Sequence, residues 1–253
     1  MISRKRLVLN ADDFGFTPDV NRGIVAAHRN GIVTATTLMA NGDAFDDGVR
    51  LARETPSLDV GCHLVLISGR SLVPPYRPLP AAVPELLLAA AARRIRIYDE
   101  LAAQVRKILA AGLRPTHLDT HKHTHLFPPV LEAVARVSQE FEIRWVRRTL
   151  DVPVLRRRFE RTLAPHGCRA TGYFAGFKLT GRFRAPELVR LIRALPDGVT
   201  EFMCHPGYSG DLRHAPTRLK ESREHEMQAL MSSQARAALA EAGVELTNYR
   251  MLD

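Results

Sequence analysis

The chain has 253 residues, of which 45% are hydrophobic and 25% are charged, a balance that is ordinary for a folded protein with one large α/β domain or two small ones. Its three cysteines (Cys62, Cys168 and Cys204) are too few and too scattered for a disulfide framework or a cysteine-rich zinc site, so we expect a reducing, cytoplasmic setting. The longest uncharged apolar run, 86–92, is far shorter than the roughly 20 residues of a membrane span, and the apolar stretch near the N-terminus is too short for a signal peptide.

The formal net charge is +9, which raises the question of an anionic partner such as nucleic acid. Only five of the 36 basic residues are lysine, however, and a chain rich in both arginine and alanine often reflects genomic base composition. The sequence carries no zinc-finger, helix-turn-helix or RNP-like motif. We therefore expect no nucleic-acid partner, and a basic nucleic-acid-binding protein remains the alternative from outside the enzymes.

Short β-like runs alternate with helical runs along the whole chain. In the first half, the pattern predicts a strand over 6–11, a helix over 18–31, a strand over 35–41, a helix over 44–56, a strand over 59–66, a proline-rich connection over 73–84 and a helix over 98–112. In the second half, it predicts a strand over 115–121, a helix over 128–141, a strand over 143–148, a helix over 185–196, a strand over 198–205, a long helix over 221–243 and a terminal segment over 244–249.

Sustained strand–helix alternation is typical of parallel strands joined by crossover helices. At least six such units favour a (β/α) barrel, complete or incomplete, rather than an open doubly wound sheet, and we expect a single domain over residues 1–253. No G-x-G-x-x-G follows the first strand and no G-x-x-x-x-G-K-[ST] occurs, so the dinucleotide and P-loop classes lack their defining loops. In a barrel of this kind, functional residues are expected where strands end and the following loops begin.

The stretch "HLDTHKHTHLF" (117–127) places four histidines and an aspartate at every second position. If the run were an extended strand, these five polar side chains would share one face; they are His117, Asp119, His121, His123 and His125. A histidine-rich loop without a task is the simpler interpretation of the run alone. The choice depends on which other groups could share a metal or a proton with it.

Four polar clusters fall at the ends of predicted strands, and this coincidence favours a site. They are the acidic pair Asp12 and Asp13, His63, the histidine run that begins at His121, and His205 before a Pro-Gly turn. Taken singly, each has an ordinary structural explanation, such as an acidic turn or a core histidine. Cys62 and Cys204 precede two of the histidines and should face the opposite way, into packing.

Two histidines and a carboxylate form a set that is typical of a catalytic Zn²⁺ or a similar divalent ion. Beyond such a set, the chain retains a carboxylate, Asp12, and an imidazole, His205, which are the base and the acid that metal-assisted hydrolysis needs. A phosphoesterase acting at the same metal site is an alternative, but a single metal with few aspartate ligands is sparse for phosphate chemistry.

The sequence resembles the YdjC-like carbohydrate deacetylases, the family of chitooligosaccharide deacetylase. The matching stretches run from residue 10 to residue 208 and are "NADDFGFTPDVNRGI", "NGIVTATTLM", "VGCHLVL", "PTHLDTHKHTHLFP" and "CHPGY". The resemblance implies an irregular (β/α) barrel of the polysaccharide-deacetylase type, one divalent metal ion (Zn²⁺ or Mg²⁺), and removal of acetyl groups from an N-acetylated sugar.

Carried over by position, the resemblance implies that Asp13, His63 and His121 hold the metal. It also implies Asp12 as the catalytic base and His205 as the catalytic acid. The choice of His121 over its neighbours in the run rests on the family position, so the roles of His123 and His125 stay open.

Residues 72–98 match no pattern of the family. A related branch acts on sugars attached to lipids, and the apolar and basic sequence over 79–98 would suit a lipid or a membrane surface. A packed connecting helix is the preferred interpretation. A lipid-linked sugar and a homodimer are left open.

Overall fold

The computed structural model describes residues 5–148, 153–215 and 217–252. Within these residues, eight parallel strands form one sheet in the order β5-β4-β3-β2-β1-β7-β6, and β8 pairs with the first half of β1. The strands are β1 (Lys5–Phe14), β2 (Ala35–Leu38), β3 (Asp59–Leu64), β4 (His117–Thr120), β5 (Trp145–Val146), β6 (Tyr173–Ala175), β7 (Gly198–Cys204) and β8 (Val244–Leu246).

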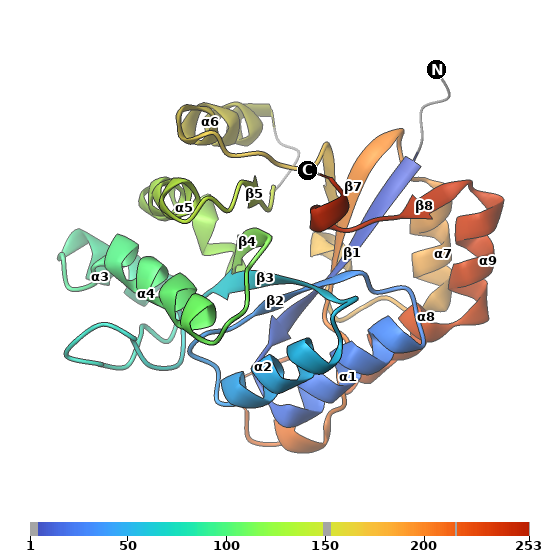
Figure 1. Cartoon of the computed structure of the whole chain (residues 1–253), viewed down its shortest axis with the longest axis horizontal. Helices are drawn as coiled ribbons and strands as arrows, with labels where there is room; N and C mark the ends of the chain where they lie inside the picture. The colour runs from blue at the N-terminus through green and yellow to red at the C-terminus, as the bar shows by residue number, and fades with distance from the viewer. Residues whose placement is uncertain (1–4, 149–152, 216, 253) are drawn as a thin grey trace.

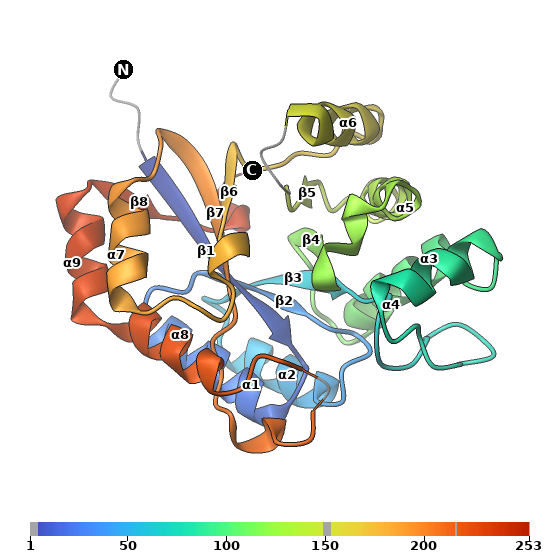
Figure 2. The same cartoon turned by 180° about the vertical axis from the view of Figure 1, so that it is seen from behind.

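Helices lie around the outside of the strands (Figures 1 and 2). They are α1 (Pro18–Arg29), α2 (Phe45–Glu54), α3 (Val83–Ala91), α4 (Ile97–Ala110), α5 (Pro128–Glu140), α6 (Pro153–Leu163), α7 (Ala185–Arg193), α8 (Glu221–Met231) and α9 (Ser233–Glu241). The start of α1 shows why the sequence folds this way locally. The Thr17 side chain accepts a hydrogen bond from the backbone N–H of Val20, and Pro18 fits the first turn, where its missing N–H is not needed.

The sheet curls into an irregular barrel, as the sequence predicts. Trp145 of β5 forms a parallel bridge with Arg169, and β6, only a few residues further on, pairs with β7 at the other edge of the sheet. One short segment, 169–175, therefore contacts both edges. All eight strands run in the same direction, so their carboxyl ends lie at one mouth of the barrel.

The two faces of β1 have different surroundings. Leu7 and Leu9 belong to the large apolar core, whereas Asn10 and Asp12 lie on the alternate face and are held by polar partners. Strand β4 shows the same alternation, because Leu118 is in the apolar core while Asp119 is bonded to polar groups. The interior of the barrel is thus a buried polar network, and such a network is stable only if its members are paired.

The histidine run departs from the predicted strand. Strand β4 ends at Thr120, and residues His121–Leu126 form the 3-10 helix η1, in which Lys122 and His123 have φ angles of 53° and 51°. The prediction that five alternate side chains share one face is therefore wrong beyond Thr120. Side-chain alternation requires extended backbone, and two consecutive left-handed residues end it.

The predicted last helix over 221–243 is also wrong as one element. It breaks at Ser232, whose ψ of 147° ends α8 and whose hydroxyl accepts a hydrogen bond from the N–H of Ala235 to begin α9. Helix α6 and strand β6 are not predicted from the sequence. Helix α3 buries Leu86 and leaves Val83, Leu87 and Leu88 exposed. No helix of the described ranges is both long enough and apolar enough to cross a membrane.

Candidate active site

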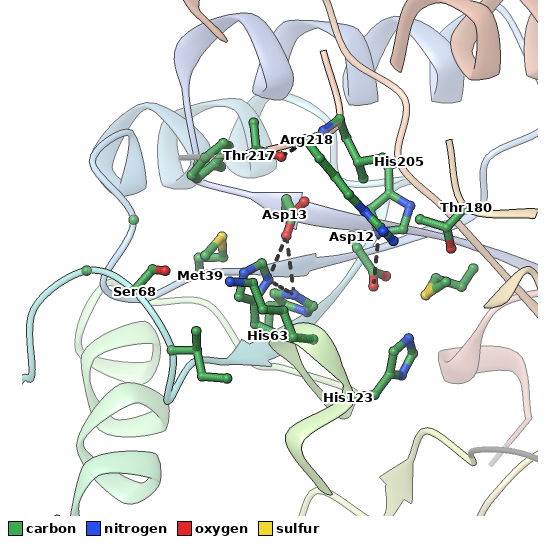
Figure 3. Close-up of a pocket in the computed structure, with 18 of the residues that line it drawn as sticks. Asp12, Asp13, Met39, His63, Ser68, His123, Thr180, His205, Thr217 and Arg218 are labelled. Carbon is green, nitrogen blue, oxygen red and sulfur yellow. Dashed lines mark hydrogen bonds and ion pairs between the residues drawn. The ribbon is translucent and has the colours of Figure 1, made fainter. Parts of the chain in front are cut away.

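A cavity of about 730 Å³ opens at the carboxyl ends of the strands (Figure 3). It is lined by all five residues predicted from the sequence, which come from the ends of β1, β3 and β7 and from the start of η1: Asp12, Asp13, His63, His121 and His205. Segments that are far apart in the sequence therefore meet at one mouth of the barrel.

The neighbouring acids point to different partners because the end of β1 is irregular. The pairing register between β1 and β2 shifts between Ala11 and Phe14, and Asp13 has a φ of 70°. Left-handed backbone is uncommon for a residue other than glycine, although aspartate tolerates it better than most. As a result, Asp12 bonds to Arg147 and Asp13 faces two histidines.

Three ligand-type atoms converge around Asp13. Its Oδ1 lies 3.3 Å from Nε2 of His63 and 3.3 Å from Nδ1 of His121, and these two nitrogens are 3.3 Å apart. Oδ1 is buried and makes no hydrogen bond of good geometry. The centre of a triangle with such sides is about 1.9 Å from each corner, close to the roughly 2.0–2.2 Å at which Zn²⁺ binds imidazole nitrogen and carboxylate oxygen. The residues present fit a divalent metal.

Arg223 holds the other oxygen of Asp13. Its Nη2 donates a hydrogen bond of 2.5 Å to Oδ2. Burial alone would raise the pKa of Asp13, but the Arg223 guanidinium and the two imidazoles outweigh burial and hold that pKa well below its usual range. Asp13 is therefore an anion, with one oxygen free to bind a cation.

His63 is oriented from behind by Asp119. The Asp119 carboxylate lies 2.7 Å from Nδ1 of His63 and also accepts a hydrogen bond of 3.1 Å from the hydroxyl of Thr37. Burial would lower the pKa of His63, but Asp119 and Asp13 raise that pKa to about 10. A carboxylate behind a histidine ligand fixes the orientation of the ring and makes the other ring nitrogen a stronger metal ligand. A cation bound to that nitrogen, Nε2 of His63, would replace a proton.

Arg147 joins the acids inside the barrel. Its guanidinium binds both oxygens of Asp12 at 2.6 Å, and it pairs with Asp119 and Glu201 at 2.7 Å each. Burial alone would raise the pKa of Asp12, but Arg147 outweighs burial and lowers that pKa well below its usual range. Asp12 is therefore ionised throughout the neutral range and held in one orientation.

His205 lies on the wall of the cavity next to Asp12. Its Nε2 is 3.9 Å from Oδ2 of Asp12, and its backbone N–H donates a hydrogen bond of 2.6 Å to Glu226. Burial lowers the pKa of His205 to about 4, although Asp12 acts in the opposite direction. The imidazole is thus neutral at neutral pH. The predicted Pro-Gly turn is backed by α1, because a Cβ at Gly23 would lie 2.4 Å from the Cα of Gly207.

The other histidines of the run differ in position. His117 is buried inside the barrel, where its Nε2 lies 3.0 Å from the side-chain oxygen of Asn10 and its ring stacks on Tyr249. His125 is buried against the hydroxyl of Thr120. Both have local polar partners, and neither lines the cavity.

A second group of possible ligands consists of Asp12, His63 and Asp119. Arg147 already binds oxygens of both carboxylates, so a cation there would face a buried guanidinium. The group around Asp13 therefore fits a metal better.

Four residues that support the site received no role from the sequence: Arg147, Glu226, Arg223, and Asp119, which was noted only as a member of the histidine run. Asp119 and Arg147 lie near the carboxyl ends of the predicted strands 115–121 and 143–148. Considering every charged residue at those strand ends as a candidate would therefore have included both. Glu226 and Arg223 belong to α8, where nothing in the sequence distinguishes them from the more exposed charged residues of the same helix.

Together, the fold and the site define an α/β barrel with a His-His-Asp candidate metal centre at the carboxyl ends of its strands. The family model described as "YdjC-like protein" matches residues 6–241. A carbohydrate deacetylase of Geobacillus stearothermophilus is 35% identical over 250 residues, which cover 96% of each chain. A chitooligosaccharide deacetylase of Salmonella paratyphi B is 32% identical over 94% of this chain and 95% of its own. The chain therefore belongs to the YdjC-like family.

Solved structures support the same fold. A candidate cellobiose-phosphate cleavage protein from Enterococcus faecalis superimposes with a TM-score of 0.85 at 23% identity, covering 99% of both chains. A lactam utilization protein from Thermus thermophilus gives a TM-score of 0.53 at 18% identity, covering 95% of this chain and 98% of its own. At these identities the likeness establishes the barrel fold alone.

Proposed function

We propose that this chain is a metal-dependent hydrolase that removes the acetyl group from an N-acetylated sugar, acting as one domain in the cytoplasm. One observation carries the proposal: a buried carboxylate oxygen without a hydrogen bond faces two imidazole nitrogens, and an ionised carboxylate stands beside it in the same cavity. The names of the relatives, carbohydrate deacetylase and chitooligosaccharide deacetylase, supply the reaction class.

Asp13, His63 and His121 are the residues that would hold the metal. Two nitrogen ligands suit Zn²⁺ or a similar transition metal better than Mg²⁺, which prefers oxygen. When bound, such an ion polarises the acetamide carbonyl and lowers the pKa of water. Asp119 and Arg223 keep two of the ligands in place.

Asp12 and His205 carry the proton. Asp12 is anionic because of Arg147, and it accepts a proton from the water that attacks the acetamide carbon. The amine cannot leave as an anion, so its nitrogen must be protonated as the C–N bond breaks. His205 is neutral in the free protein, so the proton that it delivers is the one that Asp12 has taken. The 3.9 Å between Nε2 of His205 and Oδ2 of Asp12 is too long for a direct hydrogen bond, so one water carries the proton between them. The products are acetate and a free amino sugar.

Acetate release from purified protein tests this function. The substrates are N-acetylglucosamine, its di- and trisaccharides, and a glycolipid that carries the same sugar, since α3 exposes apolar side chains. The expected result is acetate and primary amine in equal amounts from at least one of them. Turnover of an aromatic phosphate ester without acetate release would instead support the phosphoesterase, and no turnover of any substrate by metal-loaded protein would contradict the proposal.

A further inference from the structure

One histidine that lines the cavity, His123, has no role in proton transfer or in the candidate metal site. His123 follows Lys122 in the left-handed region of backbone conformation. Each such residue costs about 1–2 kcal/mol, so the turn must be held by other contacts. Thr120 supplies one, because its hydroxyl accepts a hydrogen bond of 3.2 Å from the N–H of His125. The strained turn aims the His123 ring into the cavity (Figure 3).

The His123 ring packs against aromatic side chains but has no polar partner in the described part of the chain. Its centroid lies 5.0 Å from that of Phe177 and 5.9 Å from that of Phe174, both edge to face. Nδ1 is buried without a hydrogen bond. Nε2 of the same ring also has no hydrogen-bond partner in the described part of the chain. Unlike Nδ1, it is accessible to solvent, and because His123 lines the cavity, we infer that Nε2 faces it. An imidazole nitrogen without a partner at the wall of a cavity is a group that can hydrogen-bond a ligand.

Phe177 presents an apolar surface to the same cavity. The residue is 44% exposed although it lines the cavity and an adjoining groove. Gly176 holds it there: with a φ of 106°, a Cβ at this position would lie 2.3 Å from the carbonyl oxygen of Met203. The chain before Phe177 therefore packs directly on β7, and the phenyl ring stands at the rim of the cavity.

We propose that His123 and Phe177 form a binding subsite for the pyranose ring of the substrate. The phenyl ring of Phe177 packs on the apolar C–H face of the sugar, and Nε2 of His123 hydrogen-bonds a ring hydroxyl. A hydroxyl can both donate and accept, so it suits either tautomer of the imidazole. In Figure 3, Asp12 lies between His205 and His123. A sugar held by His123 thus lies in the same cavity as the base and the acid. This subsite rests on the proposed deacetylase function.

A purely structural role predicts a different substitution pattern. If His123 served only to pack against Phe174 and Phe177, then phenylalanine would replace it without loss. If it served the metal, its replacement would remove the ion. The variant His123→Phe separates these roles because it keeps the aromatic packing and removes the nitrogen.

The test compares His123→Phe, Phe177→Ala and the control Tyr173→Ala on di-N-acetylchitobiose, with metal content measured on the same samples. Tyr173 is 40% exposed and lies in the same segment, but it does not line the cavity. Loss of one neutral hydrogen bond should raise the KM of His123→Phe about 2- to 13-fold, with the loss falling on KM rather than kcat and the metal retained. Phe177→Ala should raise KM by a similar factor, and Tyr173→Ala should match wild type.

Calorimetric binding of the same disaccharide gives a readout that does not need turnover. Weaker binding by His123→Phe and Phe177→Ala, with no acetate released even by wild type, would uphold the subsite and contradict the deacetylase function alone. An active His123→Phe with wild-type KM and wild-type binding would overturn the subsite. Loss of metal from His123→Phe would overturn it as well, because the residue would then belong to the metal centre.

Discussion

Asp119 allows the sharpest test of how the site is built, because it contacts the candidate metal ligand His63 but does not belong to the candidate ligand group Asp13, His63 and His121. Its carboxylate lies 2.7 Å from Nδ1 of His63 and 2.7 Å from Nη1 of Arg147. Replacing a carboxylate behind a histidine ligand typically costs 10- to 100-fold in metal affinity, or about 1.4–2.7 kcal/mol. Asp119→Asn keeps an acceptor for the ring nitrogen, so we expect a loss of about 10-fold, the lower end of that range.

The assay is a competition titration of zinc between the protein and a chelator of known affinity. Asp12→Asn is the matched control, because it also takes one carboxylate from Arg147 but makes no contact with Nδ1 of His63. Asp119→Asn should bind zinc more weakly than Asp12→Asn. Equal affinity for Asp119→Asn and wild type would refute the orienting role. An equal loss of zinc affinity in both variants would mean that the effect comes from the ion pairs of Arg147 and not from the contact with His63.

Three further predictions follow from the geometry of the site and of the last helices. Asp12→Asn should keep its metal and lose acetate release by about 100-fold or more, and His205→Ala should lose a similar factor; loss of metal from Asp12→Asn would make Asp12 a ligand. Because the pKa of His205 is lowered to about 4, the imidazole is mostly neutral above about pH 5, so kcat/KM should show no alkaline decline that depends on His205 between about pH 5 and pH 8. A decline near pH 6–7 that His205→Ala abolishes would show that this group enters protonated. Ser232→Ala should lower the free energy of unfolding by about 1 kcal/mol in a urea titration, because it removes the N-cap of α9, whereas Ser233→Ala should have little effect.

The barrel could be predicted from the sequence because its signals are local. Alternating apolar runs of strand and helix length, with proline at helix starts, specify the units, and sustained alternation implies parallel strands. The ends of helices and strands could not be predicted where tertiary contacts determine them. Ser232 interrupts a sequence with helical periodicity by capping the next helix, and β6 is a three-residue strand that depends on its pairing with β7.

The position of the candidate site was predictable because functional residues of a barrel gather at the ends of its strands. Asp12, Asp13, His63 and His205 all follow that rule. The prediction that the histidines of the run share one face assumed the two-residue repeat of an extended strand. This repeat ends where Lys122 adopts left-handed backbone, and no sequence pattern predicts that conformation for a lysine.

The groups that support the site were hidden because their role depends on distant contacts. Arg147 reaches Asp12, 135 residues away, and Arg223 reaches Asp13, 210 residues away. Arginine is abundant in this chain, so neither stood out. Only the folded arrangement shows that these two guanidinium groups balance the buried acids of the barrel.

The measurement that tests the central claim most directly is metal content and acetate release on the same samples of wild type and His63→Ala. Wild type should hold one equivalent of a divalent metal per chain, lose acetate release when a chelator removes the ion, and regain it when the ion is restored. His63→Ala should fold, hold no stoichiometric metal and release no acetate. A His63→Ala protein that kept a full equivalent of metal, or metal-free wild type that still released acetate at the original rate, would contradict the account.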